Sequence, residues 1–143
     1  MVVAAPIICT LVIHLGLVEQ GPQSPPADAQ RVLFRFVQVS DTHITDEASV
    51  YLLERAVDQI NAARPRPDFV VFTGDLANDS TPAQLALFKQ TASRLRMPWY
   101  PVVGNHDMGN GGQDFEQVLG PRNRSFDVGP VTCIILDSTM DTD

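Results

Sequence analysis

The sequence predicts an α/β fold that opens with a parallel strand–helix–strand–helix–strand unit. Short runs of apolar and β-branched residues alternate with longer segments in which apolar residues recur every three or four positions. Each longer segment can cross over a sheet, so the strands on either side of it are expected to lie parallel. The carboxyl ends of such strands share one edge of the sheet, and functional residues of open α/β folds gather there.

Three parallel strands are expected, at residues 32–40, 69–73 and 99–103. The first, VLFRFVQVS, alternates in polarity and is rich in β-branched and aromatic residues. The second, FVVFT, is wholly apolar, as strands covered on both faces are. The second strand is therefore expected to be buried on both faces.

The first helix is predicted over residues 47–63. Its apolar side chains fall on one stripe, formed by Val50, Leu53, Val57 and Ile60. The helix is expected to end before the RPRP run at residues 64–67, because proline cannot continue a helix.

The second helix has a clear start. Thr81 is the expected N-cap, Pro82 the first helical residue, and Gln84 the residue that closes a capping box. The buried stripe includes Leu85 and Phe88, and the Met-Pro pair at residues 97–98 ends the helix.

Beyond the third strand, a glycine-rich loop at residues 109–112 leads to a short apolar piece at residues 115–119. Residues 125–128 and 131–136, joined by Gly129-Pro130, are typical of a hairpin. The second hairpin segment, VTCIIL, is apolar enough to be a central strand of a sheet.

Charge argues against a nucleic-acid-binding surface. The net charge is -7 with a pI near 4.7, whereas affinity for nucleic acid rests largely on clustered lysine and arginine. A small phosphate-bearing substrate would therefore require bound cations. No oligomeric state is indicated.

The first 29 residues are expected to be a leader rather than part of the domain, which would occupy residues 30–143. Residues 2–18 carry no charge, and a proline-rich stretch follows that ends in the A-x-A pattern of Ala27-Asp28-Ala29. This order is typical of a signal peptide, and a short membrane anchor is the alternative. The protein is therefore expected to be exported or membrane-anchored, or cytoplasmic if the leader reflects a wrongly chosen start codon.

Polar residues of metal-ligand type follow each predicted strand: DTH at residues 41–43, GD at residues 74–75, and GNHD at residues 104–107. Several carboxylates at one edge would repel one another unless a cation held them. Mixed carboxylate, imidazole and carboxamide ligands suit Mn, Fe or Zn better than Mg or Ca. Asp41 and His43 are alternate residues, which point the same way on an extended segment. Asp75 could bridge two ions about 3.5 to 4 Å apart, a spacing that activates water.

The motifs VSDTH, GDLAND and GNHD resemble, in order and separation, those of the calcineurin-like metallophosphoesterases. The resemblance covers residues 36–138 and is nearest to cyclic-nucleotide phosphodiesterase-like or secreted phosphohydrolase-like branches. It implies a four-layer α/β/β/α sandwich, of which this chain would hold an incomplete, C-terminally truncated part.

The resemblance also implies roles for the strand-end residues. Two divalent transition metal ions, Mn, Fe or Zn, would be held by Asp41, His43, Asp75 and Asn105. Asp75 would be the bridging ligand, and His106 would act as general acid toward the leaving group, held in place by Asp107.

Two departures from the family pattern matter. Asn78 stands where purple acid phosphatases carry tyrosine, so a tyrosinate-coloured iron site is not expected. The family's later histidine and its G-H-x-H motif do not occur among the 3 histidines of the chain, which are His14, His43 and His106. Metal binding is therefore expected to be weak, with little or no turnover by these residues alone, and one apolar sheet face is expected to lack its cover.

The expected function is metal-dependent hydrolysis of a small phosphate mono- or diester. The alternative is a catalytically dead remnant that binds a metal or a partner protein. A calcium site at the acidic edge is disfavoured by the two imidazoles and the carboxamide.

Overall fold

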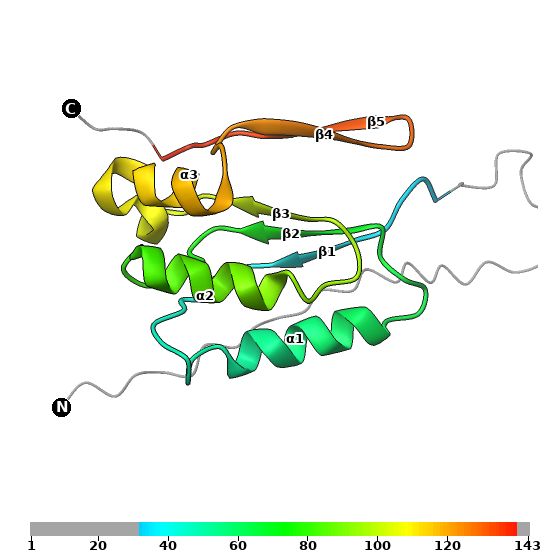
Figure 1. Ribbon diagram of the computed structural model, residues 1–143. Helices are drawn as coiled ribbons and strands as arrows, with labels where there is room; N and C mark the ends of the chain where they lie inside the picture. The colour runs from blue at the N-terminus through cyan, green and yellow to red at the C-terminus, as the bar shows by residue number, and fades with distance from the viewer. Residues whose placement is uncertain (1–31, 140–143) are drawn as a thin grey trace, which may run out of the picture.

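The computed structural model describes residues 32–139. It contains a three-stranded sheet, three α-helices, a 3₁₀ segment and a hairpin, arranged as in Figure 1. In chain order the elements are β1 (Phe36–Val39), α1 (Tyr51–Ala62), β2 (Phe69–Thr73), α2 (Pro82–Ala92), β3 (Trp99–Val102), η1 (Asn105–Gly112), α3 (Gln113–Leu119), β4 (Arg124–Val128) and β5 (Val131–Ile135). The predicted leader and anchor at residues 1–29 lie outside this range.

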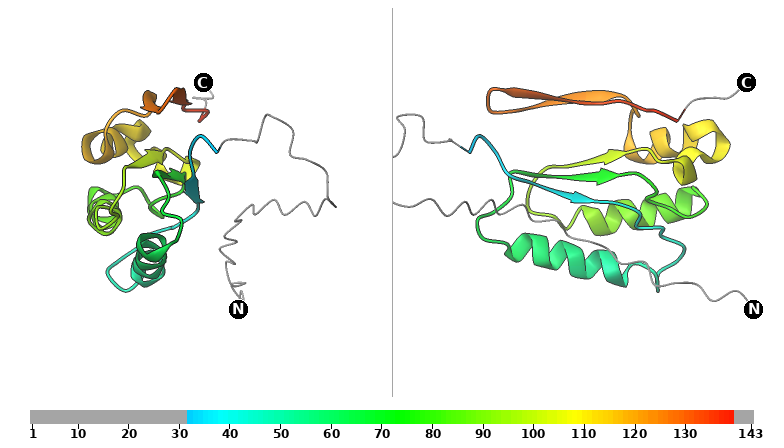
Figure 2. Two further views of the ribbon diagram at one scale, coloured as in Figure 1. Left: turned by 90° about the vertical axis from the view of Figure 1, so that its right-hand side faces the viewer. Right: turned by 180° about the vertical axis from the view of Figure 1, so that it is seen from behind.

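The sheet has the predicted parallel topology, with β2 between β1 and β3. Both crossover helices lie on the same face of the sheet, as the end-on view of Figure 2 shows. On that face Phe72 of β2 packs edge-to-face against Phe88 of α2 and against Trp99. The core therefore lies between the sheet and α1 and α2, and it is built from the stripes that the helical periodicity predicts.

β2 spans the predicted residues 69–73, whereas β1 and α1 are shorter than expected. α1 begins at Tyr51 because the preceding residues form a turn of their own. The Oδ1 atom of Asp46 accepts from the N–H of Ser49, and the Ser49 hydroxyl accepts from the N–H of Thr45. Such local side-chain bonds compete with the helix and delay its start.

The predicted N-cap of α2 is confirmed, but the predicted capping box is wrong. Thr81 accepts a hydrogen bond from the N–H of Gln84 at 3.3 Å, as an N-cap does. The side chain of Gln84 does not close the capping box. It accepts from the N–H of Asp79 and donates to the Asp79 carboxylate, because that loop brings a second set of partners within reach.

The hairpin β4–β5 lies on the other side of the sheet from α1 and α2 (Figures 1 and 2). It contacts the sheet through Phe126, whose ring packs on Phe69 and Tyr100. Within residues 32–139, β5 pairs with β4 alone and is not the central strand that its composition suggested.

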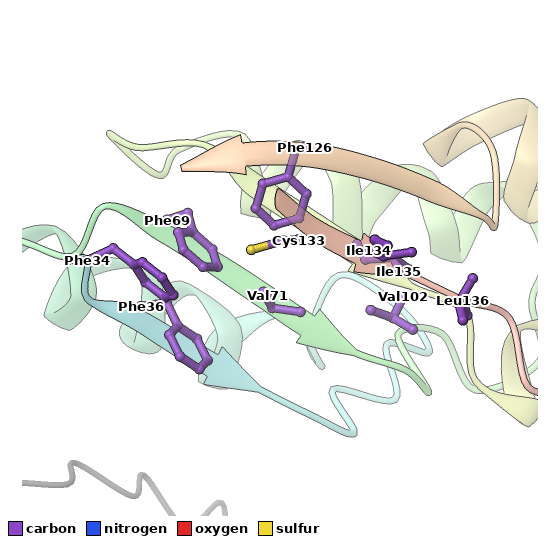
Figure 3. A pocket seen from close by; sticks show the side chains of 10 residues that line it. All are labelled: Phe34, Phe36, Phe69, Val71, Val102, Phe126, Cys133, Ile134, Ile135 and Leu136. Carbon is purple, nitrogen blue, oxygen red and sulfur yellow. The ribbon is translucent and has the colours of Figure 1, made fainter. Parts of the chain in front are cut away.

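An apolar groove of about 460 Å³ lies between the hairpin and this face of the sheet. Figure 3 shows the rings of Phe34, Phe36, Phe69 and Phe126 along it, with Ile134 and Leu136 toward the other end. Phe36 is 53% exposed and Leu136 is 69% exposed. The hairpin therefore covers part of the apolar face that was expected to be bare, and Phe36 at its edge stays exposed. None of the helices within residues 32–139 has the length and apolar character of a membrane-spanning segment.

Candidate metal centre

The loops that follow β1 and β2 run side by side at the carboxyl edge of the sheet. The N–H of Asp41 donates to the carbonyl of Gly74 at 3.1 Å, and the N–H of His43 donates to that of Asp75 at 3.0 Å. Ile44 and Ala77 continue this parallel pairing one step further. The predicted ligands of both loops are therefore fixed to one another by the backbone.

Asp41, His43 and Asp75 converge at this edge. One side-chain oxygen or nitrogen atom from each lies within 4.8 Å of the others. Nε2 of His43 is 3.9 Å from Oδ1 of Asp41 and 4.0 Å from Oδ2 of Asp75. These separations are too long for hydrogen bonds, and two ligands bound at about 2.1 Å to one ion lie roughly 3 to 4 Å apart. The donor set therefore fits a shared transition metal ion.

The same three residues have unfavourable backbone angles. Asp41, His43 and Asp75 have φ values of 57°, 41° and 53°, in the left-handed region that non-glycine residues rarely adopt. Each such residue costs about 1 to 3 kcal/mol, and such strain gathers at functional sites. The expectation of an extended Asp41-x-His43 segment is wrong: both residues have positive φ, while their N–H groups bond to the loop after β2.

The loop after β3 closes against Asp75 and requires glycine. The backbone N–H of His106 donates to Oδ1 of Asp75 at 3.0 Å. A Cβ atom on Gly104 would lie 2.3 Å from both the backbone nitrogen and Oδ1 of Asp75. Gly74, with φ of 90°, faces Gly104 from the other loop. Two glycines thus allow the second and third strand ends to touch.

The ring of His106 lies beside that of His43, with the ring centroids 4.7 Å apart and edge to face. Nδ1 of His106 is 2.8 Å from the backbone carbonyl oxygen of Asn78. A carbonyl oxygen only accepts, so Nδ1 carries a proton there and Nε2 remains for other partners. This hydrogen bond to Asn78 raises the pKa of His106, burial opposes the rise, and Asp75, Asp107 and Asp79 add to it.

The expected contact between Asp107 and the His106 ring is wrong. The carboxylate of Asp107 is fully buried and accepts from the backbone N–H groups of Leu76, Ala77 and Gly104. These N–H groups have no strand partner at the sheet edge, so the carboxylate satisfies them. Burial raises the pKa of Asp107, and the hydrogen bonds from Ala77, Gly104 and Leu76 oppose the rise.

The structure thus brings together Asp41, His43, Asp75 and His106 from all three strand ends. Asn105 is exposed at the first position of η1, next to His106 in the chain. Asn78, which stands where purple acid phosphatases carry tyrosine, orients His106 through its backbone carbonyl. No side-chain pattern could have indicated a contact made by a backbone oxygen.

This arrangement defines an α/β protein with metal-ligand side chains at the carboxyl edge of a parallel sheet. The chain belongs to the calcineurin-like phosphoesterase family, whose sequence profile matches residues 34–139.

Curated relatives match parts of the chain. A protein named "Probable glycerophosphodiester phosphodiesterase GpdQ" from Arcobacter nitrofigilis is 39% identical over 79 residues, which are 50% of this chain and 29% of that protein. The 3',5'-cyclic adenosine monophosphate phosphodiesterase CpdA of Pseudomonas aeruginosa is 28% identical over 82% of this chain and 45% of its own. The serine/threonine-protein phosphatase CPPED1 of Danio rerio is 35% identical over a match that covers 64% of this chain and 34% of that protein. The chain thus spans less than half the length of each of these relatives.

Proposed function

We propose that the chain provides part of a dinuclear metal site that hydrolyses small phosphate mono- or diesters. Asp41, His43 and Asp75 bind the first divalent transition metal ion, and Asp75 and Asn105 contribute to the second. The observation that carries this proposal is the convergence of one donor atom each from Asp41, His43 and Asp75 within 4.8 Å, with His106 alongside. Bound ions of this kind supply an acidified water and offset the negative charge of a phosphoryl group.

Asp75 is the residue best placed to serve both ions. Its Oδ1 atom is held by the N–H of His106, while its Oδ2 atom faces Nε2 of His43. The Asp75 carboxylate therefore lies between the loop after β1 and the loop after β3, with one oxygen toward each. The positive φ of Asp75 supports this role, because rarely adopted backbone angles of this kind gather at functional sites.

His106 is proposed to donate a proton to the leaving-group oxygen through Nε2. The Asn78 carbonyl holds Nδ1 and fixes the ring, so Nε2 is the atom free to meet substrate. The raised pKa of His106 favours the protonated imidazole that a general acid needs. The exposed ring lies where a small ligand can reach it.

A small phosphoester is the proposed substrate class. Two of the relatives are named as phosphodiesterases and one as a serine/threonine-protein phosphatase, so both diesters and monoesters need testing. The acidic net charge argues against a polyanionic substrate.

The test is hydrolysis of bis-p-nitrophenyl phosphate and p-nitrophenyl phosphate by the Mn²⁺-loaded protein, expressed together with its downstream reading frame, and by the Asp75→Ala variant of the same product. Loss of at least about 100-fold in rate is expected, because removing a ligand also removes charge stabilisation in the transition state. Asp127→Ala is the matched control, since Asp127 lies on the hairpin and its side chain is bonded, within residues 32–139, to Thr132 alone. Mn²⁺ binding without hydrolysis by the unaltered protein would contradict the proposal and favour a metal-binding protein without turnover.

A further inference from the structure

The carboxylate of Asp107 joins two loops that carry the site. Its Oδ1 atom accepts from the N–H groups of Leu76 and Ala77, both at 3.0 Å, in the loop after β2. Its Oδ2 atom accepts from the N–H of Gly104 at 3.0 Å, at the start of the loop after β3. Oδ2 also lies 3.1 Å from the N–H of Leu76, so both oxygens face donors.

We propose that Asp107 is a positioning residue: its carboxylate clamps the β3 loop onto the β2 loop and so sets the separation of His106 from Asp75. This inference rests on the proposed function, because it assigns Asp107 a task in the same site. Leu76 directly follows Asp75, and His106 directly precedes Asp107. The clamp therefore acts on the immediate chain neighbours of both functional residues.

A second bond secures the same two loops. The hydroxyl of Ser80, which is 1% exposed, donates to the backbone carbonyl of Asp107 at 2.7 Å. Gly109 packs so closely here that a Cβ atom would lie 2.7 Å from Cβ of Ser80. The main chain of Asp107, as well as its side chain, is thus bonded to the β2 loop.

Chemistry explains why a carboxylate occupies this buried position. An apolar side chain would fill the space with less desolvation penalty, but it would leave N–H groups of both loops without an acceptor. Asparagine offers one acceptor oxygen, and its amide nitrogen would face the N–H of Gly104, donor against donor. Asp107→Asn therefore preserves size and opens the clamp at the β3 loop.

The test is amide hydrogen exchange of the metal-free protein, followed by NMR. The reporter is the N–H of His106, which is bonded to Asp75 only while the loops stay together. In Asp107→Asn this amide is expected to exchange about tenfold faster or more, the loss that follows from one unsatisfied buried donor. Amides in the middle of α1, such as those of Val57 and Ile60, are expected to keep their rates.

Asp127→Asn on the hairpin is the matched control and is expected to leave the His106 amide unchanged. Equal acceleration of His106 and of the α1 amides would show a merely structural role and overturn the proposal. An unchanged His106 rate in folded Asp107→Asn would overturn it as well.

If Asp107→Asn does not fold, hydrogen exchange of the unaltered protein tests the clamp. Exchange measured across a denaturant series is expected to show the amides of Leu76, Ala77, Gly104 and His106 opening together, with one free energy. Separate opening of the β2-loop and β3-loop amides would contradict the clamp. These measurements use no metal, so a failure of Mn²⁺ binding or hydrolysis would reject the proposed function without deciding on Asp107.

Discussion

The backbone N–H of His106 donates to Oδ1 of Asp75 across 3.0 Å, while Oδ2 of the same carboxylate faces the His43 imidazole at 4.0 Å. The loop after β3 therefore orients the side chain of Asp75 toward the imidazole of His43 in the loop after β1. The orientation of Asp75 depends on how closely the neighbouring loops pack, and this closeness can be tested without touching any proposed ligand.

Gly104→Ala is expected to weaken Mn²⁺ binding by about tenfold or more, because a Cβ atom at 2.3 Å from Asp75 must displace that residue. Isothermal titration with Mn²⁺ measures the effect. Gly129→Ala in the hairpin turn is the control: its φ of 57° strains alanine, which the φ of -109° at Gly104 does not, but no atom beyond its chain neighbours lies within 4 Å of the added carbon. Unchanged Mn²⁺ affinity in Gly104→Ala would contradict the proposed role of Asp75.

Phe126→Ala is expected to lower the free energy of unfolding by about 1 to 3 kcal/mol, because its half-buried ring connects the hairpin to Phe69 and Tyr100. Urea denaturation provides the measurement. Ile134→Ala serves for comparison, since that side chain is 68% exposed and should change stability by no more than about 0.5 kcal/mol. Equal effects of the two substitutions would mean that the Phe126 contact does not hold the hairpin.

Thr81→Ala is expected to cost about 0.5 to 2 kcal/mol of stability through loss of the N-cap bond to Gln84. Thr81→Ser should retain most of it, since the hydroxyl is kept. Thermal unfolding of the three proteins tests both statements, and a fully stable alanine variant would show that the contacts of Gln84 with Asp79 hold this helix start by themselves.

Asp137 is expected to make stability depend on pH. Burial alone would raise its pKa, but hydrogen bonds from Thr139 and the charge and hydrogen bond of Arg122 outweigh burial and lower the pKa below the ordinary 3.8. The folded-state pKa is thus below the unfolded one, so the stabilisation is complete above the unfolded value and disappears as pH falls through the folded value. Unfolding free energies of the protein and of Asp137→Asn should therefore converge as pH falls below about 4. A constant gap down to pH 2 would contradict this assignment.

Residue patterns predicted the crossover topology because burial dictates periodicity, as β2 and the Thr81 start of α2 show. They placed Asp41, His43 and Asp75 at a common edge because parallel strands end together. They did not predict the turn that delays α1, which depends on the particular bonds between Asp46 and Ser49. Local competition of this kind depends on geometry that composition does not reveal.

At the site, too, the sequence predicts which residues come together but not their backbone angles or hydrogen-bond partners. Left-handed angles at Asp41 and Asp75 are imposed by neighbouring loops, and neither residue type signals them as glycine would. Two of the three backbone partners of the Asp107 carboxylate, Leu76 and Ala77, are 31 and 30 positions away in the chain. Its place beside His106 in the sequence therefore suggested the wrong contact.

The most direct test of the shared metal site is paramagnetic broadening by substoichiometric Mn²⁺ in the ¹⁵N-labelled protein. Amide resonances of Asp41, His43, Asp75 and His106 are expected to broaden together at the lowest Mn²⁺ concentrations, while those of the hairpin turn between β4 and β5, at the opposite end of the sheet (Figure 1), stay sharp. Broadening that starts elsewhere, or that reaches the three strand-end loops at widely different concentrations, would contradict a common ion at the carboxyl edge of the sheet.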